Sequence, residues 1–92
     1  MNDIITLQAR LDGAALKTLS TDLTRACSKR SVRIDAGGVT HLGALGLQLL
    51  LSASRTLRRD GGTFEFVAIS DRASDQLAKM GLTPETVSGG MI

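Results

Sequence analysis

The sequence predicts a small α/β protein in which strands and helices alternate along the chain. Apolar residues recur at helical spacing in three segments, and a short run rich in Val, Ile or Phe precedes each of them. Aromatic residues make up only 2% of the 92 residues, so we expect a core of Leu, Ile, Val and Ala. Such a core suits helices packed on a buried sheet.

The first half of the chain predicts a strand, a helix and a second strand. Residues 4–9 form the first strand, and Asp12 and Gly13 end it, with Asp12 able to cap a helix over residues 14–27. Polar residues 28–31 form a loop before a strand over residues 32–36, which Gly37 and Gly38 close. The first helix is expected to turn one apolar stripe inward: Ala15, Leu16, Leu19, Leu23, Ala26 and Cys27.

The second half repeats the pattern after a connector over residues 39–43. A leucine-rich helix is expected over residues 44–60, a strand over 63–69 with Phe64, Phe66 and Ala68 on one face, and a helix from Ser70 or Asp71 to Met80. Gly81 and Leu82 predict a Schellman ending, Thr83 and Pro84 a turn, and Val87 the start of a short edge strand. The leucine-rich helix is expected to turn Leu47, Leu50, Leu51, Ser54 and Leu57 inward.

This order implies right-handed crossovers and a mostly parallel sheet in one domain over residues 1–92. We expect a structured core over about residues 4–82 and a short C-terminal tail over 83–92. The residues expected to be buried are Leu16, Leu19, Leu23, Ile34, Leu47, Leu50, Leu51, Phe66, Leu77 and Met80.

Composition argues against several kinds of partner. The net charge is only +2, and the basic residues form two adjacent pairs, Lys29–Arg30 and Arg58–Arg59, rather than one stripe. With almost no aromatic side chains for base stacking, nucleic-acid binding is not expected. The start of the chain lacks the pattern of a signal peptide, and no apolar run approaches the roughly 18 residues of a membrane span. We therefore expect a cytoplasmic protein that is not inserted in a membrane.

The sequence offers few groups for chemistry, and we expect neither an enzyme nor a cofactor. The single histidine, His41, and the single cysteine, Cys27, lie far apart, so no metal site is expected. Cys27 falls on the apolar side of the first helix and is expected to be an inert thiol. Glycines at 37, 38, 43 and 46 match no phosphate-binding fingerprint, so we assign them to tight turning and close packing.

The remaining indication of function lies at the junction between the connector and the leucine-rich helix. Inward packing accounts for Leu47, Leu50 and Leu51, but Leu45 and Leu49 lie four residues apart on the flank of the helix. These two leucines form either a docking patch or a pair that packs under a neighbouring loop.

At this junction the sequence resembles the STAS domain family, the domains related to anti-anti-sigma factors. The family pattern has a strand ending in Asp, then Val-Thr-x-Ile-Asp-Ser-Ser/Ala-Gly-Leu, then a leucine-rich helix. Here Val32-Arg-Ile-Asp35 precedes Val39-Thr-His-Leu-Gly-Ala-Leu-Gly-Leu47, and Gly61–Gly62, the strand to Ile69 and Met80-Gly-Leu82 follow in order. The resemblance spans about residues 4–82 and implies a sheet of about four strands with helices packed mainly on one side.

The resemblance also implies how the protein acts. The Asp-Ser pair of the family falls on Gly43 and Ala44, and that serine is the residue phosphorylated by a partner kinase. Ala44 has no hydroxyl, so the chain resembles a permanently unphosphorylated, binding-competent form. The partner-binding surface is expected to comprise His41, Leu42, Gly43, Ala44, Leu45 and Leu49.

Two partners are compatible with this resemblance in a bacterial cell. The first is a histidine-kinase-like anti-sigma factor or another signalling kinase, for which the chain is an anti-sigma factor antagonist. The alternative is the ATPase of a phospholipid-transport ABC system, in which small STAS subunits are similarly compact and leucine-rich and need no phosphoserine.

Overall fold

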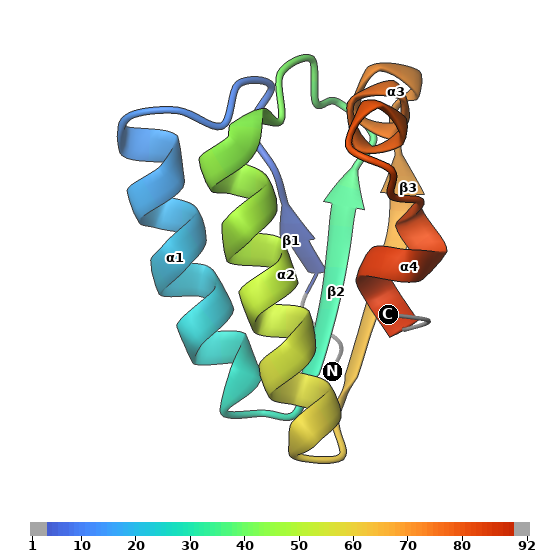
Figure 1. Ribbon diagram of the computed structural model, residues 1–92. Coiled ribbons are helices and arrows are strands. Elements are labelled where there is room, and N and C mark those ends of the chain that lie inside the picture. Colours follow the sequence, from blue (N-terminus) through green and yellow to red (C-terminus); the bar gives the residue numbers. More distant parts are fainter. Residues whose placement is uncertain (1–3, 90–92) are drawn as a thin grey trace.

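The computed structural model describes residues 4–89 and confirms the alternation of strands and helices (Figure 1). All elements pack around one hydrophobic cluster. In chain order the elements are β1 (Ile4–Thr6), α1 (Ala14–Cys27), β2 (Ser31–Ala36), α2 (Gly43–Arg59), β3 (Thr63–Ile69), α3 (Asp71–Lys79) and α4 (Pro84–Gly89).

The described residues form a three-stranded sheet in the order β1-β2-β3, with both pairs parallel. The expectation of about four strands therefore exceeds what residues 4–89 form, while the expected parallel pairing is confirmed. In this register Ile34 of β2 lies between Ile5 of β1 and Phe66 of β3.

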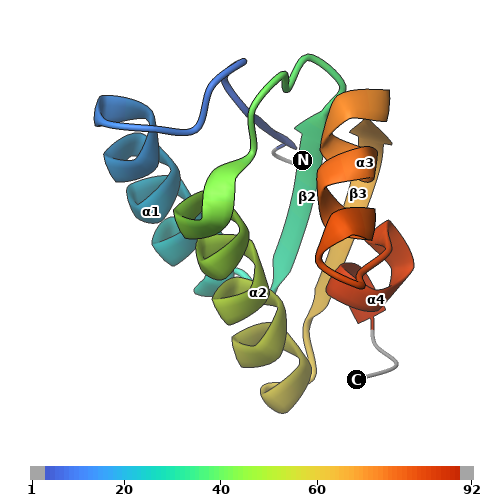
Figure 2. The ribbon, with the colours of Figure 1, turned by 45° about the horizontal axis from the view of Figure 1, so that its top comes forward.

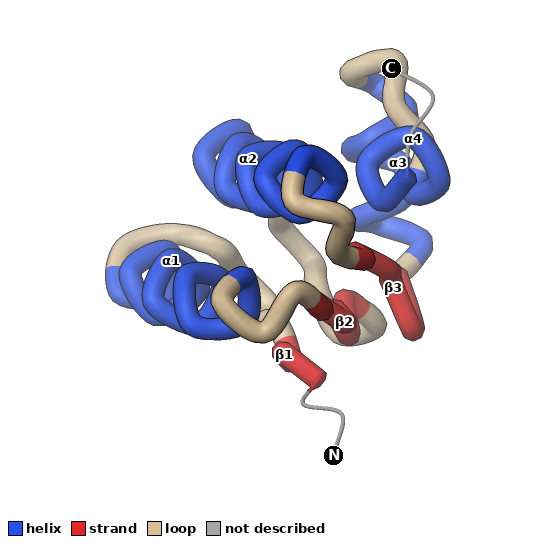
Figure 3. The backbone as a smooth tube through the Cα atoms, turned by 90° about the horizontal axis from the view of Figure 1, so that it is seen from below, coloured by secondary structure: helices blue, strands red, loops and turns tan. Residues whose placement is uncertain are grey.

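The helices cover one face of the sheet. Seen end-on, α1, α2, α3 and α4 lie on the same side of the row of strands (Figure 3). The β2 side chains that face the helices, Val32, Ile34 and Ala36, are at most 1% exposed. On the opposite face Arg33 of β2 donates a hydrogen bond of 2.9 Å to the carboxylate of Glu65 in β3.

The two long helices bury the stripes expected of them. Of the predicted set, Leu19, Leu23, Leu47, Leu50 and Leu77 are buried, whereas Leu16, Leu51 and Phe66 are half-buried and pack against the edge of the core. The cap of α1 differs from expectation: Gly13 rather than Asp12 occupies the N-cap position, and the Asp12 carboxylate instead pairs with Arg10 at 3.3 Å.

A β-bulge changes which residues of β3 face the core. Ile34 pairs with Phe66, but the next residue, Asp35, pairs with Ala68, so β3 contains one extra residue at Val67. Beyond the bulge the alternation is shifted, which leaves Ala68 exposed and packs Ile69 against the core. The prediction that Ala68 shares the face of Phe64 and Phe66 is therefore wrong.

The end of α3 is the predicted Schellman motif, but Met80 does not point inward. The Leu82 N–H donates to the Leu77 carbonyl, the Gly81 N–H donates to the Ala78 carbonyl, and Gly81 has φ +76°. Met80 is the C-cap residue, outside the helical stripe of Ala73 and Leu77, and is 48% exposed. Leu82 packs against the core in its place.

The expected edge strand at Val87 is instead the short helix α4, which packs on α2 and β3 (Figures 1 and 2). Pro84 suits the first helical position, and the Thr83 hydroxyl accepts a hydrogen bond from the Thr86 N–H. Val87 is fully buried, and its carbonyl accepts a 2.5 Å hydrogen bond from the Ser54 hydroxyl of α2. Val87 thus belongs to the core, although it falls in the stretch expected to be a C-terminal tail, of which 90–92 lie outside the described residues.

Candidate functional site

The connector between β2 and α2 is fixed on one side by the loop that follows β1. The backbone N–H groups of Thr40 and His41 donate to the carbonyl of Ala9 at 2.8 and 3.0 Å, and the Leu11 N–H donates to the His41 carbonyl at 3.0 Å. Arg10 and His41 form an isolated parallel bridge. These bonds continue the pairing of β1 and β2 beyond the strand ends and hold the residues that precede α2.

Gln76 of α3 fixes the connector on its other side. Its side-chain Oε1 accepts a 2.7 Å hydrogen bond from the Leu42 N–H, and its Nε2 donates to the Thr40 carbonyl at 3.1 Å. Ser70 adds a bond from its hydroxyl to the Val39 carbonyl. No pattern in the sequence indicates the role of Gln76, because this residue is 34 positions from Leu42 and only the fold brings the two together.

Of the predicted docking residues, Leu42 and Gly43 do not present side-chain surface. Leu42 is 3% exposed, because its side chain packs into the core at the start of α2. Gly43 has φ +73°, and a Cβ there would lie 3.3 Å from Nε2 of His41. The space beside Gly43 is thus bounded by the chain's own histidine.

Gly46 has the packing role assigned to it from the sequence. A Cβ at Gly46 would lie 3.1 Å from Cδ1 and 3.2 Å from Cβ of Leu11, and both Gly46 and Leu11 are buried. The missing side chain lets the first turn of α2 approach the loop before α1.

The remaining predicted residues form an exposed, largely apolar surface at the start of α2. His41 and Ala44 are exposed, Leu45 is 61% exposed, and Leu49 is half-buried against the edge of the core. We call these four residues the docking surface. Leu49 therefore packs partly against the core, whereas most of the Leu45 side chain is exposed to solvent.

The first turn of α2 carries no formal charge. It contains no acidic residue, and Leu42 at the N-cap position provides no side-chain cap. The free N–H groups and the positive end of the helix dipole therefore lie next to Ala44 and Leu45.

Groups for catalysis are sparse in the part of the chain that the structure describes. Residues 4–89 contain no cluster of three or more His, Cys, Asp or Glu side chains arranged to hold a metal ion. Cys27 is half-buried at the end of α1, where burial and the nearby Asp60 carboxylate raise the pKa of its thiol. The thiolate is thus disfavoured, in agreement with an inert cysteine.

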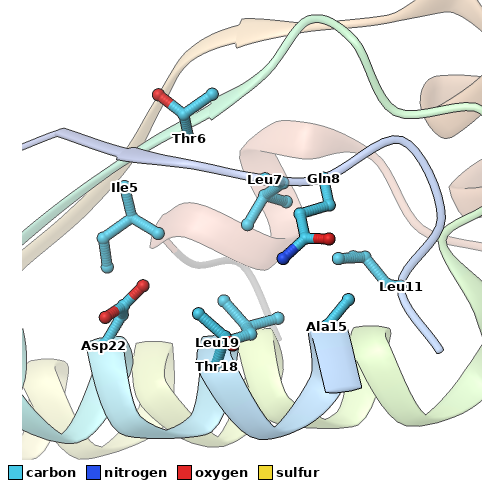
Figure 4. A pocket seen from close by; sticks show the side chains of 9 residues that line it. All are labelled: Ile5, Thr6, Leu7, Gln8, Leu11, Ala15, Thr18, Leu19 and Asp22. Carbon is cyan, nitrogen blue, oxygen red and sulfur yellow. The ribbon is translucent and has the colours of Figure 1, made fainter. Parts of the chain in front are cut away.

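A crevice between β1 and α1 lies to one side of this region (Figure 4). Ile5 of β1 and Leu7, the residue after the strand, point into it, and Asp22 is the ionisable residue of its lining. Its other lining residues are Thr6, Gln8, Leu11, Ala15, Thr18 and Leu19. A single carboxylate beside apolar and hydroxyl groups supplies no acid–base pair, so we assign no chemistry to this crevice.

Comparison with protein families identifies the chain. The model of the STAS domain matches residues 2–87, nearly the whole sequence. The protein belongs to the STAS domain family. STAS domains are generally non-catalytic regulatory modules that act by binding other proteins. Comparison of this STAS domain with curated proteins and with solved structures gave no significant match. None of its helices within residues 4–89 is long and apolar enough to cross a bilayer.

Proposed function

We propose that this STAS domain is a non-catalytic module that binds a partner protein through the docking surface at the start of α2. The observation that carries the proposal is the exposure of Leu45, 61%, beside an exposed Ala44. The surface rests on backbone that Ala9 and Gln76 hold from two sides. A rigid, uncharged surface with a protruding leucine binds a partner at little cost in conformational entropy.

We propose further that binding is constitutive. No Ser, Thr or Tyr occurs between Leu42 and Leu51, so no phosphate can be added to the first two turns of α2. A phosphate at the position of Ala44 would add about −1.5 to −2 charges to a surface that becomes buried on binding. With alanine there, the surface stays neutral whether or not a kinase is present.

The partner that fits best is a histidine-kinase-like anti-sigma factor or another signalling kinase, whose contact site would be apolar and uncharged. The ATPase of a phospholipid-transport ABC system is the alternative partner. Affinity purification followed by mass spectrometry separates the two, because the recovered protein is either a kinase-like regulator or an ABC ATPase.

The purified partner then tests the surface. Leu45→Ala removes the protruding side chain and should weaken binding at least tenfold in a calorimetric titration, while Arg72→Ala, an exposed change on α3, should leave affinity unchanged. Incubation with the partner and ATP should leave residues 42–51 unmodified and binding intact. Phosphate at Thr40 or Ser52 accompanied by loss of binding would contradict constitutive docking.

A further inference from the structure

The basic residues of this chain gather at one end of the molecule. Two segments, 25–30 and 55–60, contain six of the eleven Lys and Arg residues and only one of the nine acidic residues. Both segments lie where a helix ends and the next strand begins, at the lower end of Figure 1. We call the six residues the basic pole: Arg25, Lys29, Arg30, Arg55, Arg58 and Arg59.

The backbone joins the two halves of the basic pole. The Thr63 N–H donates a 3.0 Å hydrogen bond to the carbonyl of Arg30, so the loop after α2 lies against the loop after α1. Gly62 permits this approach, since a Cβ there would lie 2.6 Å from the same carbonyl oxygen. The pairs Lys29–Arg30 and Arg58–Arg59, separate in the sequence, therefore lie at one end of the fold.

Helix capping accounts for only part of this charge. Arg25, Arg58 and Arg59 lie in the last turns of α1 and α2, where cations complement the negative end of the helix dipole. Lys29, Arg30 and Arg55 lie outside those turns, and all six side chains of the basic pole are exposed. The rest of the chain has five basic and eight acidic residues, so positive charge is concentrated at this end of the molecule.

We propose that the basic pole adsorbs to the surface of an anionic phospholipid bilayer. Its six cations come from the C-terminal parts of α1 and α2 and from the turn after α1, which lie together at the lower end of Figure 1. Lipid headgroups diffuse laterally and adjust to such an arrangement, whereas an acidic peptide would need a groove to hold it. Clusters of this size attract anionic headgroups strongly enough for peripheral binding.

Other polyanions fit the basic pole less well. Helices α1 and α2 present their C-terminal carbonyls here, so the backbone offers no discrete site for a single free phosphate, and attraction comes from the side-chain cations alone. The two segments contain no aromatic residue on which a base could stack. The exposed large apolar side chains found among residues 4–89 are Ile4, Leu45, Val67 and Met80, all outside the basic pole. Adsorption is therefore electrostatic, without insertion into the acyl chains, and sensitive to salt.

The basic pole and the docking surface lie at opposite ends of α2. Leu45 and Arg59 lie 14 residues apart in α2, about 21 Å along the helix axis. An adsorbed molecule thus keeps Leu45 directed away from the bilayer, where a partner protein has access to it. The proposal does not depend on the identity of that partner.

Co-sedimentation with vesicles tests the proposal on the full-length protein. Vesicles of phosphatidylcholine containing about one third phosphatidylglycerol should bind the protein at about 0.1 M ionic strength and release it at about 0.5 M, while pure phosphatidylcholine should not bind it. Each cation near the surface changes binding roughly fivefold, so the double variant Arg55→Gln/Arg59→Gln should bind about 25-fold more weakly.

The matched control is Lys17→Gln/Arg72→Gln, which removes the same charge from exposed positions in α1 and α3. It should bind anionic vesicles as the parent does, and thermal melts establish that both variants are folded. Equal weakening by the two double variants, or no binding at low salt, would overturn the proposal. So would release of the parent from vesicles by duplex DNA or polyglutamate at equal charge concentration, which would assign the basic pole to that polyanion.

Discussion

Gln76 of α3 accepts a 2.7 Å hydrogen bond on its side-chain Oε1 from the backbone N–H of Leu42, the residue that precedes α2. The same amide group donates through Nε2 to the carbonyl of Thr40. One side chain thus satisfies a donor and an acceptor of the connector and ties the start of α2 to α3. Gln76 is a positioning residue for the docking surface, because it holds the backbone of Thr40 and Leu42, which leads directly into the first turn of α2.

Gln76→Ala should lower the free energy of unfolding by about 1–3 kcal/mol, because it leaves the partly buried Leu42 N–H without its acceptor. Gln76→Glu keeps an acceptor for Leu42 and loses only the donor to Thr40, so its loss should be smaller. Urea denaturation of both variants measures the difference. Equal losses would show that the bond to Leu42 contributes little.

Gly62→Ala should destabilise the protein by more than about 1 kcal/mol, since the new Cβ would meet the Arg30 carbonyl oxygen at 2.6 Å. The matched control is Gly38→Ala, where nothing lies within 4 Å of the new Cβ and φ is not in the left-handed region. That variant should be neutral or slightly more stable. Similar melting temperatures for the two variants would contradict close packing of the two loops.

Leu50→Ala should lower the free energy of unfolding by about 2–5 kcal/mol, because Leu50 is 1% exposed in the core face of α2. Leu45→Ala, the same substitution on the exposed flank, should change it by less than about 0.5 kcal/mol. Chemical denaturation compares the pair. A larger loss of stability for Leu45→Ala than for Leu50→Ala would show that a different face of α2 packs on the core.

Cys27 should react slowly with alkylating agents at neutral pH, because burial and the Asp60 carboxylate raise its pKa. Since the pKa is raised on folding, the associated stability is present at neutral pH and is lost as pH rises through the folded-state value. Asp60→Asn removes the smaller of the two causes. The pH profile of iodoacetamide reaction should therefore move only part of the way toward that of a free thiol, and an unchanged profile would exclude a contribution from Asp60.

Most of the fold follows from local patterns in the sequence. The bounds of α1 and β3 are those predicted. Helix α2 begins and ends one residue earlier than predicted, and α3 ends one residue earlier. These bounds could be predicted because helical stripes and glycine endings are local signals. Val67 and Val87 show where such signals fail. The bulge at Val67 depends on pairing with β2. The burial of Val87 depends on the packing of α4 against α2 and β3, and its carbonyl is bonded by Ser54, 33 residues away.

The exposure of Leu45 could be predicted from the sequence, but the contacts that surround the candidate site could not. Exposure of Leu45 could be expected because other leucines of α2 already form the face that packs on the core. Three of these contacts join segments distant in the chain. Leu42 is buried in the core, Leu11 fills the space beside Gly46, and Gln76 bonds to the connector through both atoms of its amide. No helical or strand period encodes such contacts, so they needed the three-dimensional structure.

The most direct test of constitutive docking is the affinity of Ala44→Asp for the purified partner, measured by calorimetric titration. Ala44 is exposed in the first turn of α2, where a carboxylate faces the positive end of the helix dipole, so the melting temperature should hold or rise slightly. Burial of an unpaired charge at the interface should weaken binding tenfold or more, about 1.4 kcal/mol, whereas Ser20→Asp on the exposed side of α1 should not. An Ala44→Asp protein that is folded and binds as tightly as the parent would contradict the account and move the docking surface elsewhere.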